Sequence, residues 1–140
     1  MKKLLLILFL IPNLVTAEIL KDYLDKNPTW SEDISSIIYV TTRCSAVLQV
    51  YGERRLTVND VEIGQIIQEK GRGLALISGE LALDSGISYD NFKNRLIVWI
   101  KKYADEGNSN WDMHNNYLVG GFADDFQICY QTIYPRLVGS

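Results

Sequence analysis

Apolar residues along most of this chain recur at steps of three and four, the pattern of helices with one buried face. Four long stretches of this kind follow a shorter one, and we place them at residues 18–27, 29–51, 57–83, 88–106 and 112–134. Residues 37–42 are rich in β-branched side chains and also suit a strand, but the helical period continues through them. The pattern predicts an all-α, four-helix antiparallel bundle, which a short leading helix can precede.

Residues that favour helix starts set the predicted N-terminal boundaries. Thr29, with Glu32 three residues later, predicts a capping box in which each side chain accepts a backbone N–H of the first turn. Thr57 with Asp60 resembles a second start of this kind. Ser88 is placed to cap the third long helix.

Glycine and proline set the predicted ends and breaks. Gly52 and Gly107 are placed to end the first and third long helices, and Pro135 to end the last. Gly71 predicts either a kink or break in the second helix or a close approach of another helix. The pair Gly120–Gly121 could interrupt the fourth helix.

Two cysteines, Cys44 and Cys129, add a constraint on this topology. Each falls on the apolar face of its helix, the first and the last of the bundle, and these two helices are neighbours in an up-down-up-down arrangement. We therefore expect an intramolecular disulfide, which would stabilise the fold by roughly 4 kcal/mol on the loop-entropy model. Free thiols or a bridge between chains are the alternatives.

The first residues have the composition of a secretion signal. Basic Lys2 and Lys3 precede an apolar run over residues 4–11, and Val15 and Ala17 occupy the positions that signal cleavage requires. A membrane-spanning helix needs about 20 apolar residues, so an uncleaved anchor is the weaker alternative. We predict a cleaved signal over residues 1–17, a single domain over 18–140, no stable membrane insertion afterwards, and a periplasmic or secreted location.

The charge balance bears on the choice of partners. The whole chain has a net charge of −3, and without Lys2 and Lys3 there remain 12 basic against 17 acidic side chains, or about −5. This surface argues against nucleic acid and against anionic lipid as partners. Arg54 and Arg55 form the only adjacent arginine pair, which we assign to a solvated loop.

Cofactor and metal motifs are not evident. The segment Gly71–Arg72–Gly73 lacks the third glycine and the preceding strand of a dinucleotide fingerprint. One histidine and two cysteines are too few for a structural zinc site. We therefore expect neither a metal nor a cofactor.

Two groups of residues are candidates for chemistry. An aromatic ring among amides suits recognition of a polar ligand, and this ligand-binding candidate comprises Trp111, His114, Asn115 and Asn116. Paired carboxylates suit glycoside cleavage when they face each other across a cleft. The carboxylate candidates are Glu80, Asp84, Asp124 and Asp125.

These observations rank two functions. The first is an exported, non-enzymatic helical protein that binds a partner protein of unknown identity or a small polar ligand. The alternative is a small hydrolase of envelope polymers that uses the paired carboxylates.

Overall fold

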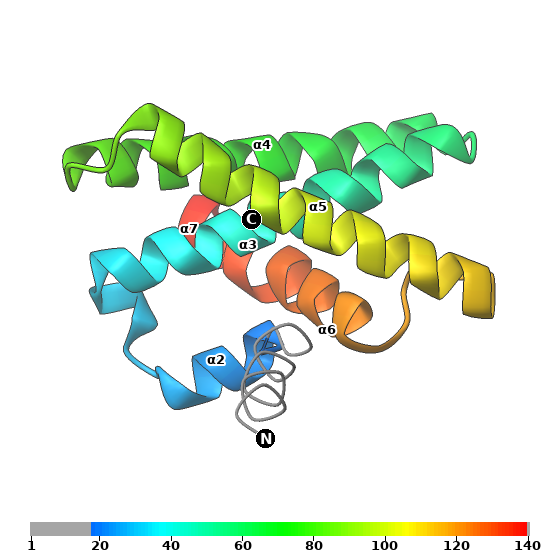
Figure 1. Cartoon of the computed structure of the whole chain (residues 1–140), viewed down its shortest axis with the longest axis horizontal. Helices are drawn as coiled ribbons and strands as arrows, with labels where there is room; N and C mark the ends of the chain where they lie inside the picture. The colour runs from blue at the N-terminus through cyan, green and yellow to red at the C-terminus, as the bar shows by residue number, and fades with distance from the viewer. Residues whose placement is uncertain (1–17, 140) are drawn as a thin grey trace, which may run out of the picture.

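The computed structural model describes residues 18–139, and every regular element in that range is helical. The predicted signal, residues 1–17, lies outside the described residues. The helices are α2 (Leu20–Lys26), η1 (Trp30–Glu32), α3 (Ile34–Thr57), α4 (Val61–Asp84), α5 (Tyr89–His114), α6 (Gly120–Ile128), the π-helical turn η2 (Cys129–Ile133) and α7 (Tyr134–Val138). Successive long helices run in opposite directions (Figure 1), so the predicted all-α bundle with a short leading helix is confirmed.

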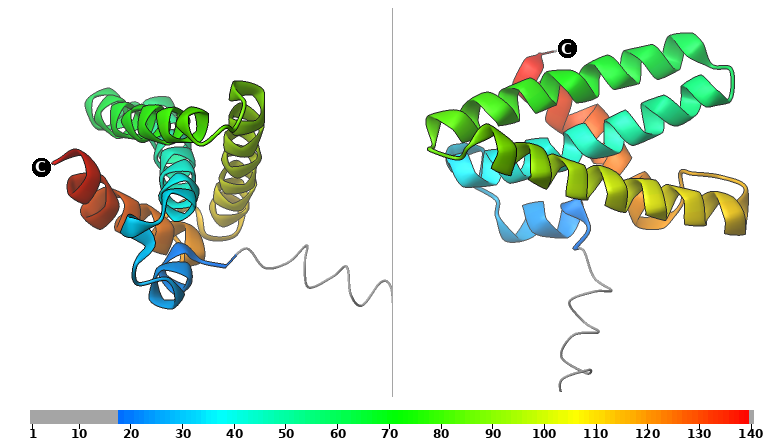
Figure 2. Two further views of the ribbon diagram at one scale, coloured as in Figure 1. Left: turned by 90° about the vertical axis from the view of Figure 1, so that its left-hand side faces the viewer. Right: turned by 45° about the horizontal axis from the view of Figure 1, so that its top comes forward.

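Helix α3 forms the centre of the molecule. Every residue from 40 to 48 is buried, so this part of α3 is covered on all sides, as the left view in Figure 2 shows. A helix segment enclosed on every side belongs to the core, here together with its polar residues Thr41, Thr42, Arg43 and Ser45. The β-branched residues 37–42 are therefore helical because they are enclosed by other helices, which overrides their preference for strands.

Helices α3 and α4 pack with their backbones in close contact. A Cβ on Gly71 would lie 3.1 Å from the Ser45 carbonyl oxygen, and one on Gly64 would lie 2.9 Å from the Gly52 carbonyl oxygen. The Ser45 hydroxyl donates to the Gly71 carbonyl at 2.7 Å. Of the two predictions for Gly71, close approach is confirmed and a break is wrong, because α4 is continuous from Val61 to Asp84.

Two predicted caps have different outcomes. The Ser88 side chain accepts from the backbone N–H of Asn91 at 3.2 Å, so this cap is confirmed. Thr29 precedes only the short turn η1 and makes no side-chain cap. Helix α3 begins after Asp33, whose carboxylate accepts from the Ser36 N–H at 2.9 Å. The predicted start at Thr29 is wrong because η1 separates it from the long helix.

Several predicted helix ends are too early. Gly52 lies inside α3, which continues to Thr57, and Gly107 lies inside α5, which continues to His114. The last helix begins at Gly120 rather than at residue 112 and continues past Pro135, which follows the π-helical turn. Gly52 and Gly107 each lie close to a neighbouring segment, so tertiary packing explains why glycine occurs inside these helices. Thr57, predicted to start α4, ends α3 instead.

The disulfide between Cys44 and Cys129 is present. It joins the centre of α3 to η2, with 5.1 Å between the two α-carbons, and both residues are fully buried. The predicted proximity of the first and last long helices is confirmed. None of the helices between residues 18 and 139 combines the length and hydrophobicity that a membrane-spanning helix needs.

Candidate functional site

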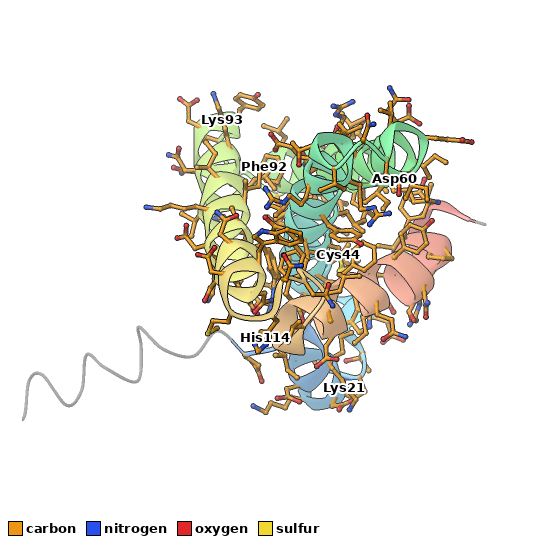
Figure 3. All side chains as sticks on the ribbon, turned by 90° about the vertical axis from the view of Figure 1, so that its right-hand side faces the viewer. Lys21, Cys44, Asp60, Phe92, Lys93 and His114 are labelled. Carbon is orange, nitrogen blue, oxygen red and sulfur yellow. A yellow bond between two sulfur atoms is a disulfide. The ribbon has the colours of Figure 1, made fainter. Side chains whose placement is uncertain are left out.

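A groove with a volume of about 260 Å³ lies between the C-terminal halves of α3 and α5. Figure 3 looks onto the end of the molecule where Asp60 precedes α4 and His114 ends α5, which is the end toward which both lining helices run. Its lining combines aliphatic side chains with both charges, an amide and two hydroxyls. The lining residues are Val50, Glu53, Arg54, Thr57, Ile100, Ala104, Asn108 and Tyr117.

Arg54 is the cation of this groove, and two aromatic rings hold it. The carbon at the centre of its guanidinium lies 4.2 Å from the ring centroid of Tyr117 and 5.2 Å from that of Trp111. The two rings stack on each other with their centroids 5.3 Å apart. Such contacts between a guanidinium and a ring face stabilise by about 0.5–2 kcal/mol, depending on how far the cation is desolvated. The rings therefore fix Arg54 without neutralising its charge.

The polar atoms of Arg54 differ in their surroundings. Its Nε is buried without a hydrogen-bond partner, and among residues 18–139 it is the one buried side-chain nitrogen or oxygen of which this is true. Arg54 also takes part in none of the four ion pairs within that range. The terminal Nη atoms are consequently the donors that Arg54 offers to a molecule in the groove.

The segment after α5 returns Tyr117 to the wall of the groove. The Asn110 side-chain amide donates to the carbonyls of Tyr117 and Val119 at 3.0 and 3.1 Å, which holds this segment against α5. The ring of Tyr117 packs on the backbone at Gly107, where a Cβ would lie only 2.8 Å from it. The Tyr117 hydroxyl donates to Asn108 at 3.3 Å. The absence of a side chain at Gly107 thus leaves space for the Tyr117 ring, which packs against Arg54.

The predicted ligand residues divide between the groove and the turn beside it. Trp111 is 37 % exposed and lies against Arg54. Asn115 has the left-handed backbone conformation, with φ of 53°, that ends α5. The Asn116 side chain accepts from the Leu118 N–H at 3.0 Å. His114 is exposed at the end of α5. Trp111 therefore acts on the groove through its contacts with Arg54 and Tyr117, which line it, and the asparagines shape the turn.

None of the eight lining residues of the groove is among the four ligand candidates predicted from the sequence. The assignment of Arg54 and Arg55 to a loop is wrong, because both lie in α3. Arg55 pairs with Asp60 across the turn to α4, whereas Arg54 points to the rings. An aromatic and amide-rich segment was the available signal for Tyr117 and Asn108, but no pattern along the chain indicates that α3 supplies the cation.

A second arginine forms the polar centre of the core. Arg43 is 1 % exposed, and its Nη2 donates to the Asp125 carboxylate at 2.6 Å. The Tyr103 hydroxyl donates to the same carboxylate at 2.6 Å, and the Leu20 N–H donates to its other oxygen at 2.7 Å. The Arg43 guanidinium also lies 4.4 Å from the Trp99 ring centroid. We call Arg43, Asp125, Tyr103 and Trp99 the core cluster.

Electrostatics in and around the core cluster follow from burial and from the ion pair. Burial opposes the charge of Arg43, but Tyr103 and Asp125 raise the pKa of its guanidinium above the ordinary value. Burial raises the pKa of the Tyr103 hydroxyl well above its ordinary value. On the edge of the cluster, burial and then the charge of Asp125 raise the pKa of Glu106. The core cluster is thus a satisfied ion pair with the neutral Tyr103 hydroxyl beside it.

The carboxylate candidates lie outside the groove. Glu80 and Asp84 are exposed on α4, and Asp124 is exposed on α6. Asp125 is 2 % exposed and engages both of its carboxylate oxygens in the core cluster. Each carboxylate oxygen of Asp125 therefore has a partner in the core, whereas the carboxylates of Glu80, Asp84 and Asp124 are in solvent.

Metal ligands are not gathered in the part of the chain that the structure describes. Between residues 18 and 139, no three side chains from histidine, cysteine, aspartate and glutamate come together in a way that could hold an ion. The groove itself offers one carboxylate, that of Glu53, and one cation.

The fold and the groove define a disulfide-linked helical bundle with an amphipathic interhelical site. Comparison of the chain with protein-family models, with curated proteins and with solved structures found no match. The function is therefore inferred from the residues of the groove.

Proposed function

We propose that this chain is an exported, non-enzymatic binding protein and that its ligand occupies the groove between α3 and α5. The placement of Arg54 carries the proposal: a cation without a carboxylate partner lies on two rings at the wall of a concave, partly apolar site. Ligand sites combine apolar walls with a few polar groups that orient the ligand, and this groove has both.

Export is supported by two independent features. The first residues have the composition of a secretion signal. The Cys44–Cys129 disulfide suits an oxidising compartment such as the periplasm or the extracellular space. Together they favour a ligand that the protein meets outside the cytoplasm.

A matched pair of substitutions tests the site. Ala104 lines the groove, and Ala123 lines a separate depression of about 250 Å³ over α6 and η2. Both are partly buried in helices, so Ala104→Phe fills the groove and Ala123→Phe serves as its control. Amide NMR spectra of residues 18–140 with a library of small fragments are the measurement. We expect fragment-induced shifts at Trp111 and Asn108 that disappear in Ala104→Phe and persist in Ala123→Phe.

Two results would contradict the proposal. The groove would be excluded if fragments perturb other surfaces and leave Trp111 and Asn108 unaffected. The non-enzymatic part would be overturned if the protein released soluble products from isolated cell-wall polymer and a carboxylate variant, such as Glu80→Gln, abolished the release. The second result would favour the hydrolase alternative.

A further inference from the structure

We propose that the groove recognises the carboxylate of a small ligand with an apolar body, and that the Nη atoms of Arg54 bind the carboxylate end-on. This inference rests on the proposed function, because it names the ligand class of the same groove. It follows from the geometry of Arg54, the distribution of charge around it and the size of the site.

The orientation of Arg54 decides which of its donors can bind. A guanidinium that stacks on a ring uses its flat face, and its N–H groups remain in the plane at its edges. On Arg54 the guanidinium carbon lies 4.2 Å from the Tyr117 ring centroid and the Nε is buried, so the edge with the two Nη atoms is left for a ligand. Two parallel donors at one edge match the two oxygens of a carboxylate.

The charges near Arg54 favour a monoanion over a dianion. Glu53 also lines the groove, and the protein without residues 1–17 has a net charge of about −5. A phosphate monoester carries a charge of about −1.5 to −2 at pH 7 and would meet a single cation in these negative surroundings. A carboxylate with a single negative charge matches one unpaired guanidinium.

The remaining walls select the body of the ligand. Val50, Ile100 and Ala104 supply the aliphatic part of the lining, contributed by both helices. The volume of about 260 Å³ lies just below the range of roughly 300–1,000 Å³ that is typical of drug-sized ligands. The ligand that fits is therefore compact, with a carboxylate at one end and an apolar group of moderate size at the other.

The test compares three probes of one shape: 3-phenylpropionate, its neutral amide 3-phenylpropionamide, and 2-phenylethyl phosphate. Binding of each to residues 18–140 is measured at pH 7 and low salt from the NMR shift of the Trp111 indole N–H. We expect the carboxylate to bind at least about tenfold more tightly than the amide, because a charge-assisted, two-point hydrogen bond is stronger than a neutral one. We also expect it to bind more tightly than the phosphate.

Two neighbouring arginines provide the matched control. Arg54→Gln should remove the preference for the carboxylate over the amide, and Arg54→Lys should restore part of it because lysine keeps the charge without the fork. Arg55→Gln removes the same charge from the same helix outside the groove and should keep the preference. Melting temperatures of all variants establish that each is folded.

The outcomes separate this inference from the proposed function. If the carboxylate and the amide bind the groove equally, or if the phosphate binds best, the carboxylate assignment is overturned while the groove remains a binding site. If Arg55→Gln abolishes the preference as fully as Arg54→Gln does, net charge rather than Arg54 is responsible, and the assignment is also overturned. If neither these probes nor the fragment library perturbs the groove, the proposed function fails as well.

Discussion

Arg43 and Arg54 come from the same helix, and each lies against aromatic rings, but they differ in burial and in ion pairing. Arg43 is sealed in the core and pairs with Asp125. Arg54 lies in an open groove and has ring faces but no carboxylate. A buried charge is stable only with a hydrogen-bonded counter-charge, whereas a charge at a groove can keep its hydration. Arg43, which is paired, therefore stabilises the fold, whereas Arg54, which is unpaired, is available to bind a ligand.

The largest expected effect comes from breaking the buried pair. Asp125→Asn leaves Arg43 without a counter-charge in the core, so we expect the free energy of unfolding to fall by about 3–5 kcal/mol. Urea unfolding followed by circular dichroism at pH 7 measures it. The neighbouring exposed Asp124 gives the control, since Asp124→Asn should change stability by less than about 0.5 kcal/mol. Equal effects of the two substitutions would show that the core cluster does not depend on its ion pair.

The next effect concerns the ring that supports Arg54. In Gly107→Ala the new Cβ would lie 2.8 Å from Tyr117 and 3.4 Å from Phe122, so one of these rings must move. We expect a loss of about 1–3 kcal/mol from overpacking. Gly73 is also inside a helix, but a Cβ there would have no atom closer than 3.9 Å, so Gly73→Ala should stabilise by up to about 1 kcal/mol. Urea unfolding of both variants measures these changes. If Gly107→Ala proved stabilising, the close packing of Tyr117 on Gly107 would be contradicted.

How far the sequence predicts the fold depends on whether a feature is local. The Ser88 cap and the apolar faces of Cys44 and Cys129 depend on neighbours along the helix, and both were predicted. Gly52 and Gly107 were wrongly predicted to be helix ends. The intrinsic tendency of glycine to end a helix is weak compared with tertiary packing. Contact with another segment decides their positions instead.

The candidate site was predictable only in part for the same reason. Trp111 stood out because of the amides around it. Arg54 comes from α3, much earlier in the chain, and gains its rings only when α3 and α5 cross. The partners Arg43 and Asp125 are still further apart in the chain, with a sequence separation of 82 residues. A single sequence specifies each helix and leaves the pairing of such side chains to tertiary packing.

A smaller effect is expected from Arg54 itself. Arg54→Gln loses the contact with the two rings, worth about 0.5–1 kcal/mol at a partly exposed site, but also removes the buried Nε that lacks a partner. We expect the free energy of unfolding to change by less than about 1 kcal/mol, in contrast to the large loss in Asp125→Asn. Urea unfolding checks this. A loss of about 3 kcal/mol or more, on the scale of a broken buried pair, would make Arg54 a structural residue like Arg43.

The smallest effect tests the charge balance at the edge of the core cluster. The pKa of Glu106 is raised above its ordinary value of 4.5, first by burial and then by Asp125, so folding favours the neutral acid. Its contribution to stability is therefore complete below pH 4.5 and is lost as the pH rises through the folded-state pKa. Glu106→Gln, always neutral, should match the native protein near pH 4 and exceed it at pH 7 by about 0.5 kcal/mol, since solvent screens a half-buried group. Urea unfolding at both pH values measures the difference. A variant that is less stable at pH 7 would mean that the Glu106 carboxylate is favoured by Arg43 and Lys102, and that the cluster attracts negative charge beyond Asp125.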